Sequence, residues 1–251
     1  MEKALYREMY ELENSYWWFV ARRRIVLSLV EKYVKPPHAP RFLDLGCGTG
    51  SMLQALEGRG EVVGVDASGE ALAFAATRTK VALVRGDVPE VLLSLEGKFD
   101  CVLLLDLLEH VGDDLETVRA AAGVLDGDGV MIITVPAHPW LYAPRDTYHH
   151  HLRRYRKREV KGLVAGAGLD EVFTSYCNAL FFPVAAAQRL WSRMSGKEPG
   201  PDIKPLPKIL NGIMEEAFAA ERFLLGRMPL PWGLSLVAVA RRRHDKDVNA
   251  C

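Results

Sequence analysis

Cysteine is scarce in this chain, a net charge is missing, and no two cysteines form a Cys-x-x-Cys pair. The 251 residues include only four cysteines, Cys47, Cys101, Cys177 and Cys251. This usage argues against a disulfide framework and predicts reduced thiols and a cytoplasmic location. The 32 lysine and arginine residues balance the 32 aspartate and glutamate residues, so no global field selects nucleic acid as a partner.

Long apolar runs are also missing. A membrane-spanning helix requires ~20 predominantly apolar residues, and the nearest stretch, Ala179 to Ala187, is too short. The first residues mix charged and apolar side chains and do not look like a signal peptide. At 49% hydrophobic residues, the chain can bury the core of one large domain, or of one domain with a cap.

Strand-like and helix-like segments alternate from residue 41 onward. Short apolar runs predict strands at Phe42–Leu45, Glu61–Val65, Ala82–Arg85, Phe99–Leu105, Val130–Val135, Glu171–Tyr176 and Leu234–Ala240. Helical spacing predicts the helices Ser51–Leu56, Gly69–Thr77, Val88–Leu95, Asp114–Val124 and Lys157–Ala167. This alternation is typical of the α/β class with a doubly wound, Rossmann-like sheet.

Three regions are expected within a single compact domain. Residues 1–35 show helical spacing without interior proline or glycine, which predicts one long helical lid that ends before Pro36. Residues 41–177 together with 232–242 form the ligand-binding core. Residues 178–231 are apolar and aromatic around a proline-rich loop, Glu198 to Pro207, and predict a cap over the carboxyl edge of the sheet.

A glycine-rich turn, Gly46-Cys-Gly-Thr-Gly50, follows the first predicted strand. Its glycines let backbone N–H groups approach a ligand closely. Acidic residues recur at successive strand ends, at Asp44, Asp66, Asp87 and Asp106. A dinucleotide would also use such a turn and Asp66, but the spacing is G-x-G-x-G and not G-x-G-x-x-G. The carboxylates favour a ligand that carries positive charge.

These motifs resemble those of the class I S-adenosylmethionine-dependent methyltransferases. The segment Phe42–Gly50 looks like the glycine motif of that family, and Phe99–Val111 resembles its fourth-strand motif. Asp126-Gly-Asp-Gly stands where a Pro-Gly-Gly turn is usual. The resemblance implies S-adenosylmethionine as cofactor and a seven-stranded sheet, mostly parallel with an antiparallel last strand. It implies that the cofactor contacts Asp44, Gly46, Cys47, Gly48, Gly50, Asp66, Ala67, Asp87, Val88, Asp106 and Leu107.

Two further motifs are similar to a bacterial branch of small-molecule methyltransferases. Tyr16-Trp-Trp-Phe-Val-Ala-Arg-Arg23 resembles a box in which histidine usually stands at the position of Tyr16. Asp146-Thr-Tyr-His-His-His151-Leu-Arg-Arg-Tyr155 resembles a segment after the fifth strand of that branch. We expect an anionic or amphiphilic acceptor to contact Tyr16, Trp17, Trp18, His138, Arg153, Arg154 and Tyr155.

Methyl transfer from a sulfonium requires alignment of the acceptor with the methyl group, and a hydroxyl acceptor also requires a base. We expect His151 to be that base, with His110 as the second candidate. His149 and His150 complete a histidine triplet that could point toward a metal. Three neighbours on one loop cannot surround an ion, however, so no metal site is expected.

The sequence thus predicts a methyltransferase that acts on a small molecule, most readily at a hydroxyl or carboxylate oxygen. Methylation at nitrogen or carbon, on a natural product or a sugar or lipid intermediate, stays open. The basic run Arg153 to Arg158 leaves an RNA methyltransferase open, and a cofactor-binding protein without catalysis is a further alternative. The chain is expected to be a monomer or a homodimer.

Overall fold

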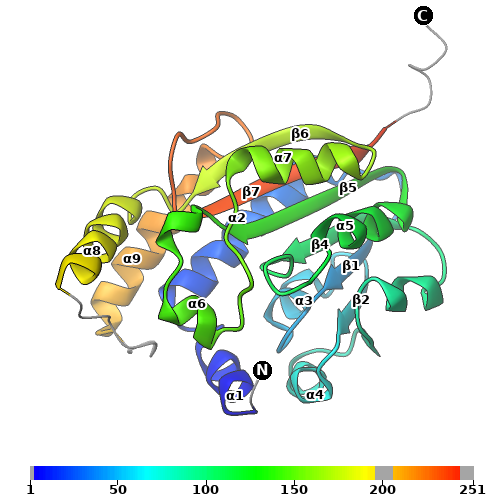
Figure 1. The fold of residues 1–251 in the computed structure, drawn as a ribbon. Helices are drawn as coiled ribbons and strands as arrows, with labels where there is room; N and C mark the ends of the chain where they lie inside the picture. Colours follow the sequence, from blue (N-terminus) through cyan, green and yellow to red (C-terminus); the bar gives the residue numbers. More distant parts are fainter. Residues whose placement is uncertain (1–2, 196–205, 244–251) are drawn as a thin grey trace, which may run out of the picture.

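A seven-stranded sheet forms the centre of the protein (Figure 1). The structure is a computed structural model that describes residues 3–195 and 206–243. The strands are β1 (Arg41–Leu45), β2 (Glu61–Asp66), β3 (Ala82–Arg85), β4 (Phe99–Leu105), β5 (Leu125–Pro136), β6 (Leu169–Cys177) and β7 (Ser235–Arg242). Their order is β3-β2-β1-β4-β5-β7-β6. In this sheet β7 alone runs antiparallel, to both β5 and β6. The predicted fold class is confirmed.

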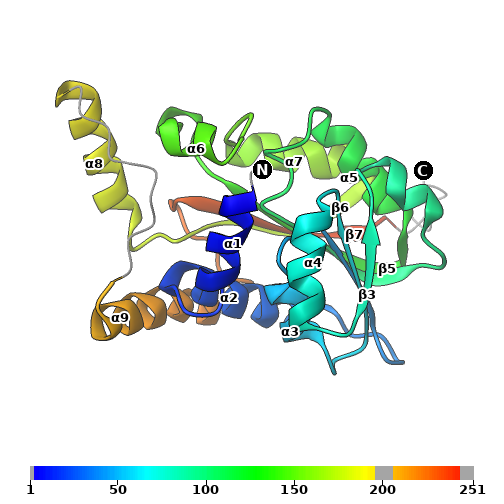
Figure 2. The ribbon, with the colours of Figure 1, turned by 90° about the horizontal axis from the view of Figure 1, so that it is seen from below.

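Helices cover both faces of the sheet (Figure 2). One face packs on α5 (Asp114–Gly123) and α7 (Lys157–Gly166), and the other on α2 (Trp17–Tyr33), α3 (Ser51–Leu56) and α4 (Gly69–Arg78). All seven residues of β4 are buried, because this central strand lies between the two helical layers. A continuous apolar run is what such a strand requires.

The amino-terminal region, predicted to be helical, contains two helices separated by a turn. α1 (Lys3–Leu12) ends before a turn, and α2 begins at Trp17. Asn14 and Ser15 lie in this turn, where short polar side chains compete with helical hydrogen bonds. The Ser15 hydroxyl donates to the Glu11 carbonyl at 3.3 Å. The break lets α1 cross the carboxyl edge of the sheet while α2 lies along its face (Figure 2).

The helix predicted at Val88–Leu95 is also shorter than expected. The structure has a 3₁₀ helix, η1 (Glu90–Ser94), whose flanking bonds run from Leu92 N to Pro89 O and from Leu95 N to Leu92 O. A segment of this length offers too few bonds to offset the cost of starting an α-helix.

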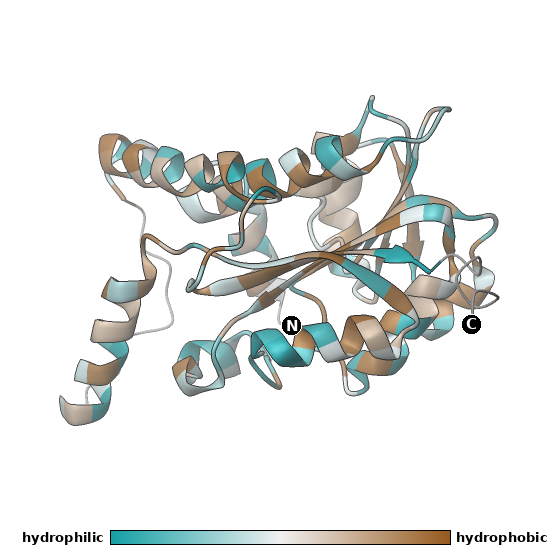
Figure 3. Cartoon of the chain, turned by 90° about the horizontal axis from the view of Figure 1, so that it is seen from above, coloured by the Kyte–Doolittle hydropathy of each residue, from teal (hydrophilic) through white to brown (hydrophobic). Residues whose placement is uncertain are grey.

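The region between β6 and β7 contributes α8 (Phe182–Ser195), α9 (Lys208–Ala219) and η3 (Ala220–Phe223). α9 lies along α2, where Arg24 pairs with Glu215 at 3.1 Å. α8 extends away from the body of the protein (Figure 3). Residues 198–205 of the predicted proline-rich loop, and Cys251, lie outside the described residues. Among the helices described, none has the length and hydropathy of a membrane-spanning segment.

Candidate active site

A cavity of about 860 Å³ opens where β1, β2 and β4 end. Parallel strands place their carboxyl ends at one edge of a sheet, and ligands of doubly wound folds bind there. The strand ends contribute Asp44, Asp66 and Asp106 to the lining, while α1 and the start of α2 contribute apolar and aromatic side chains. The loop from β5 to α7, which includes η2 (Pro139–Leu141) and α6 (Pro144–Tyr148), completes the wall.

The glycine turn is held in place by backbone hydrogen bonds to β2. The N–H groups of Gly46 and Cys47 both donate to the Val65 carbonyl, at 2.8 and 2.9 Å. Gly48 N–H donates to Asp66 Oδ2 at 2.9 Å. Gly48 has a φ of +54°, and a Cβ built on it would meet no atom within 4 Å. The turn therefore presents bare backbone to the cavity.

The other two glycines of the turn are required by packing. A Cβ on Gly46 would lie 2.9 Å from Leu107 Cδ1, and a Cβ on Gly50 would lie 2.8 Å from Ala75 Cβ. Both have positive φ, at +73° and +85°. Gly46 lines the cavity, whereas Gly50 does not and instead precedes α3 as its N-cap.

Asp44 is a buried acid without a full set of partners. Its side chain lines the cavity, and Oδ1 has no hydrogen-bond partner in the part of the chain that the structure describes. Burial raises the pKa of Asp44 to about 7, although the positive charge of Arg22 opposes this. A buried carboxylate is costly unless a cation approaches it. Asp44 is therefore suited to a ligand with positive charge.

The carboxylate of Asp66 is fixed by two backbone donors. Oδ2 accepts from Gly48 N–H, and Oδ1 accepts from Ser68 N–H at 2.8 Å. Burial raises the pKa of Asp66, and these two hydrogen bonds oppose that rise. Asp87 lines the same side of the cavity and is exposed. Cys47, Ala67, Val88 and Leu107 also line the cavity.

Arg22 connects the aromatic box, the segment Tyr16–Arg23, to the end of the fourth strand, β4. Its Nε lies 3.0 Å from Asp106 Oδ2, an ion pair by distance but without the alignment of a hydrogen bond. Asp106 Oδ1 accepts from the Thr134 hydroxyl at 3.2 Å. Glu109, one turn further on, is 1% exposed, and its Oε2 has no hydrogen-bond partner within residues 3–195 and 206–243. Burial, followed by the negative charge of Asp106, raises the pKa of Glu109 well above its usual value.

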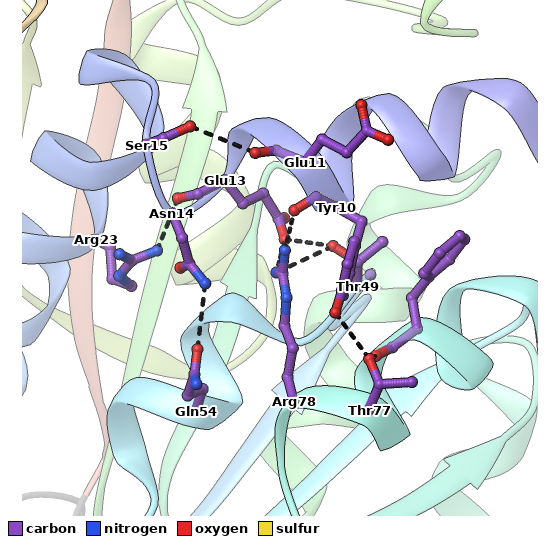
Figure 4. A network of polar contacts seen from close by, with 12 residues as sticks. Tyr10, Glu11, Glu13, Asn14, Ser15, Arg23, Thr49, Gln54, Thr77 and Arg78 are labelled. Atoms are coloured by element: carbon purple, nitrogen blue, oxygen red, sulfur yellow. Dashed lines mark hydrogen bonds and ion pairs between the residues drawn. The ribbon is translucent and has the colours of Figure 1, made fainter. Parts of the chain in front are cut away.

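A buried cluster of polar groups attaches α1 to the glycine turn and to α4 (Figure 4). Glu13 accepts hydrogen bonds from the Thr49 hydroxyl and from the Arg78 guanidinium. Arg78 also donates to the Tyr10 carbonyl, and its guanidinium lies 4.1 Å from the centre of the Tyr10 ring. We call Glu13, Thr49 and Arg78 the clasp. It holds α1 over the cofactor side of the cavity.

Two histidines face one another at the acceptor side of the cavity. The rings of His110 and His151 meet edge to face, with centroids 4.9 Å apart. His151 Nδ1 lies 3.0 Å from Asp146 Oδ1, and the same oxygen accepts from Arg154 Nε at 2.8 Å. A hydrogen on Nδ1 leaves Nε2 as the nitrogen that can accept a proton. Asp146 itself is held by the Ala143 N–H at 2.8 Å.

Burial lowers the pKa of two histidines in this part of the cavity. Burial, and then the neighbouring His151, lowers the pKa of His110 to about 4. Burial also lowers the pKa of His149 to about 4, with the charge of Arg145 adding to the effect. The pKa of Asp146 lies below its usual value: burial opposes this, but the hydrogen bond with His151 and the charge of Arg154 outweigh it.

The aromatic residues of α2 and its N-cap serve both the cavity and the core. Tyr16, Trp17 and Trp18 line the cavity, as does Arg154. Trp17 is buried, and its ring lies 4.7 Å from that of Phe181. Its backbone N–H donates to Asn211 Oδ1 at 3.0 Å, which connects α2 to α9.

Three predicted acceptor contacts lie outside the cavity lining. The Arg153 guanidinium bonds to Asp114 at 3.1 Å and to the carbonyls of residues 111 and 112 at 3.0 Å. The Tyr155 hydroxyl donates to the Leu108 carbonyl at 2.9 Å and also lies 2.9 Å from Asp114 Oδ2. His138 stacks on Tyr176 with centroids 5.0 Å apart. These side chains hold the loop that carries His151, and their placement does not support direct contact with an acceptor.

Several residues of the site were not singled out from the sequence. They are Glu13, Arg22, Glu109, Arg145, Asp146 and Asn178. The role of Asp146 could have been predicted from its position five residues before His151, because an acid near a candidate base can orient that base. No sequence pattern marks Glu13 or Asn178 as a site residue, since they reach the cavity only through the placement of α1 and of the loop after β6.

The family model for the methyltransferase domain matches residues 19–172. The chain therefore belongs to this family, and it has the fold of the class I S-adenosylmethionine-dependent methyltransferases. S-adenosylmethionine is the cofactor of that class. The resemblance inferred from the motifs is confirmed.

The similar proteins include enzymes with named acceptors. The ubiquinone biosynthesis O-methyltransferase of Bartonella quintana is 26% identical over 69% of this chain and 79% of its own length. That of Alkalilimnicola ehrlichii is 37% identical over 41% of this chain, and the match spans only 44% of that relative. An S-adenosylmethionine-dependent methyltransferase from Archaeoglobus fulgidus has a TM-score of 0.56 at 19% identity, covering 88% of this chain and 94% of its own. The plantazolicin methyltransferase, solved with S-adenosylhomocysteine, has a TM-score of 0.58 at 13% identity, covering 89% and 86%.

The cavity has the features that this cofactor requires. Gly48 leaves open space beside its backbone, where the methionine portion can lie. The partnerless Oδ1 of Asp44 suits the positive charge that the ammonium and sulfonium carry. Asp66, fixed by two N–H groups, ends β2 at the position that suits two hydroxyls of a ribose.

Proposed function

We propose that this methyltransferase transfers a methyl group to an oxygen of a small-molecule acceptor, and that His151 removes the acceptor proton. The observation that supports this most directly is the Asp146–His151 contact of 3.0 Å in the cavity wall. A histidine oriented by a buried carboxylate is the usual arrangement of a general base for a hydroxyl. The two relatives named as ubiquinone biosynthesis O-methyltransferases are consistent with a hydroxyl acceptor.

When bound, S-adenosylmethionine supplies an electrophilic methyl group on a sulfonium. On the cofactor side, Gly46, Gly48 and Asp44 would hold the methionine portion, Asp66 the ribose and Asp87 the adenine. The exposed position of Asp87 at the cavity and the fixed carboxylate of Asp66 support these roles.

On the acceptor side, His151 would take the hydroxyl proton on Nε2 while Asp146 and Arg154 keep the ring in place. Trp18 and Tyr16 would exclude water from the reacting oxygen. His110, kept neutral by burial, is the second candidate for the proton. Asn178 also lines the cavity, and its Oδ1, which has no hydrogen-bond partner among the described residues, can accept a hydrogen bond from the substrate.

The three regions expected from the sequence remain our proposal for how the chain is organised. The lid, residues 1–35, supplies α1 and the aromatic box of the cavity. The insertion, residues 178–231, supplies Ala185 and Arg189 of α8 to the cavity wall. The buried free thiols of Cys47, Cys101 and Cys177 support a reducing compartment and thus a cytoplasmic location.

The decisive experiment is an acceptor screen with a radiolabelled methyl donor, preceded by calorimetry with S-adenosylhomocysteine. We expect binding of S-adenosylhomocysteine and transfer of label to hydroxylated aromatic or carboxylated compounds. Label found on nitrogen or carbon would refute the choice of oxygen. Label found on RNA, with binding that weakens strongly as salt rises, would replace the small-molecule acceptor.

A further inference from the structure

Three potential metal ligands converge at the acceptor side of the cavity. Glu109 and His110 follow β4, and His151 comes from the loop after α6. One ligand atom from each residue lies within 4.8 Å of the other two. Ligands of a tetrahedral Zn²⁺ lie roughly 3.4 Å apart, so small rotations of the two imidazole rings would bring the three atoms around one ion.

One oxygen of the buried Glu109 carboxyl group is left without a partner in the described part of the chain. The residue is 1% exposed, yet Oε2 has no hydrogen-bond partner among the described residues. Buried carboxyl oxygens are normally paired, because an unpaired one costs free energy. Since Glu109 also lines the cavity, this oxygen is available to a ligand inside it.

The surroundings of His151 resemble the outer shell of a metal site. Histidines that bind metals commonly donate their other ring N–H to a carboxylate, which orients the ring. Asp146 occupies that position, 3.0 Å from Nδ1, and Arg154 fixes Asp146 in turn. The nitrogen left for an ion is Nε2.

We propose that Glu109, His110 and His151 bind a divalent cation, with Zn²⁺ as the ion best matched to two imidazoles and one carboxylate. Three protein ligands leave a fourth position open, as in catalytic zinc sites, and here all three ligands line the cavity. The histidine triplet on the loop is not the site, because only His151 of the triplet belongs to this group.

The cation site rests on the proposed function for its role. An acceptor hydroxyl in the open position would lose its proton more readily, because a bound cation lowers the pKa of a coordinated oxygen. Nε2 of His151 cannot bind the ion and accept a proton at once. In the ion-bound protein the cation would therefore activate the acceptor, and His151 would act as the base only in the ion-free protein.

A second group of similar composition provides a matched control. His38, Asp100 and Asp126 also place one ligand atom each within 4.8 Å of the others, at the opposite edge of the sheet where β1 and β4 begin. His38 and Asp126 are exposed, and Asp100 Oδ2 already accepts from Arg41 N–H at 2.8 Å. A divalent ion that binds only at surface histidines would depend on His38.

The experiment is calorimetric titration of Zn²⁺ into the metal-stripped full chain, with Co²⁺ absorption as a second readout of the ligand geometry. The variants are Glu109→Gln, His151→Ala and the control His38→Ala. We expect one Zn²⁺ per chain, affinity at least about tenfold weaker in Glu109→Gln and in His151→Ala, and no change in His38→Ala. Two variants on different elements keep the test valid if one of them does not fold.

Absence of Zn²⁺ binding by the wild-type chain would overturn the proposal, and so would unchanged affinity in both Glu109→Gln and His151→Ala. Loss of binding in His38→Ala alone would assign the ion to the other edge. Titration of S-adenosylhomocysteine into the same samples separates the two proposals. If S-adenosylhomocysteine binds and Zn²⁺ does not, only the cation site is refuted. If S-adenosylhomocysteine does not bind, the proposed function is refuted.

Discussion

The wall of the cavity that we assign to the cofactor and the wall that we assign to the acceptor come from differently organised parts of the chain. The cofactor wall, Asp44 to Asp66, lies within two neighbouring strands and the turn between β1 and α3, and backbone N–H groups that donate within the wall hold its shape. The acceptor wall consists of side chains from α2, the end of β4 and the loop before α7.

This difference shows where each wall is sensitive to change. Backbone donors keep their positions as long as the sheet persists, so the cofactor wall depends on glycines and on a few carboxylates. The acceptor wall depends on long-range contacts between side chains, such as Asp146 with His151 and Arg22 with Asp106. We therefore expect single substitutions to affect turnover most on the acceptor wall and cofactor affinity most on the cofactor wall.

The largest effect is expected from His151→Ala. Loss of a general base typically slows a reaction by about 100- to 10,000-fold, and we expect methyl transfer to fall within that range. Calorimetric affinity for S-adenosylhomocysteine should stay at the wild-type value, because His151 lies on the other wall. Retained turnover would exclude His151 from activating the acceptor, and reduced cofactor affinity would remove the distinction between the walls.

The clasp joins α1 to the cofactor wall, and Arg78→Met should break it. The Arg78 and Glu13 side chains are only 5% and 9% exposed. Removing one partner leaves the other charge buried, which costs about 3 kcal/mol or more. We expect urea unfolding to show a loss of this order, or proteolysis within α1 if the helix detaches alone.

The control for the clasp is Arg59→Met. Arg59 pairs with Glu31 at 2.8 Å, but both side chains are well exposed. Exposed pairs contribute about 1 kcal/mol or less. Equal destabilisation by the two substitutions, with α1 still resistant to protease, would contradict the role of the clasp.

On the cofactor wall, Asp66→Ala should weaken cofactor affinity about tenfold, or by ~1.5 kcal/mol, because it removes a charged hydrogen-bond acceptor from the ribose. Calorimetry with S-adenosylhomocysteine measures this directly. Glu116→Ala, on the exposed side of α5, serves as the control. Affinity that equals the control value would assign Asp66 to the support of the glycine turn alone.

The smallest effect concerns the pH dependence of binding at Asp44. Its pKa of about 7 means that the carboxyl is largely protonated in the free protein below that pH. A cationic ligand prefers the ionised form, so binding should release a proton, and affinity should rise as the pH increases through about 7. We expect affinity for S-adenosylmethionine to increase severalfold from pH 6 to pH 8 in the wild-type chain.

Asp44→Asn should bind more weakly at pH 8 and show a flatter profile, because the asparagine does not titrate. A profile of unchanged slope in this variant would place the titrating group elsewhere.

The sequence by itself determined the sheet and the cofactor wall. Apolar runs of strand length, glycines at 46, 48 and 50, and carboxylates at strand ends are local patterns, and local patterns are readable because hydrogen-bond periodicity and steric limits act over a few residues. The bounds of α3, β3 and β4 were predicted as observed. Cys47, predicted to be a small buried side chain, is buried in the turn.

The acceptor wall was decided by the tertiary structure. The motif around Asp146 and His151 could be recognised in the sequence. The sequence did not show that Arg153 and Tyr155 hold the loop of this motif, or that Arg154 fixes Asp146. The contacts of Glu13 with Thr49 and Arg78, which hold α1 beside the glycine turn, could not be predicted either. Contacts between residues far apart in sequence leave no local pattern, because burial and the meeting of distant side chains set their energy.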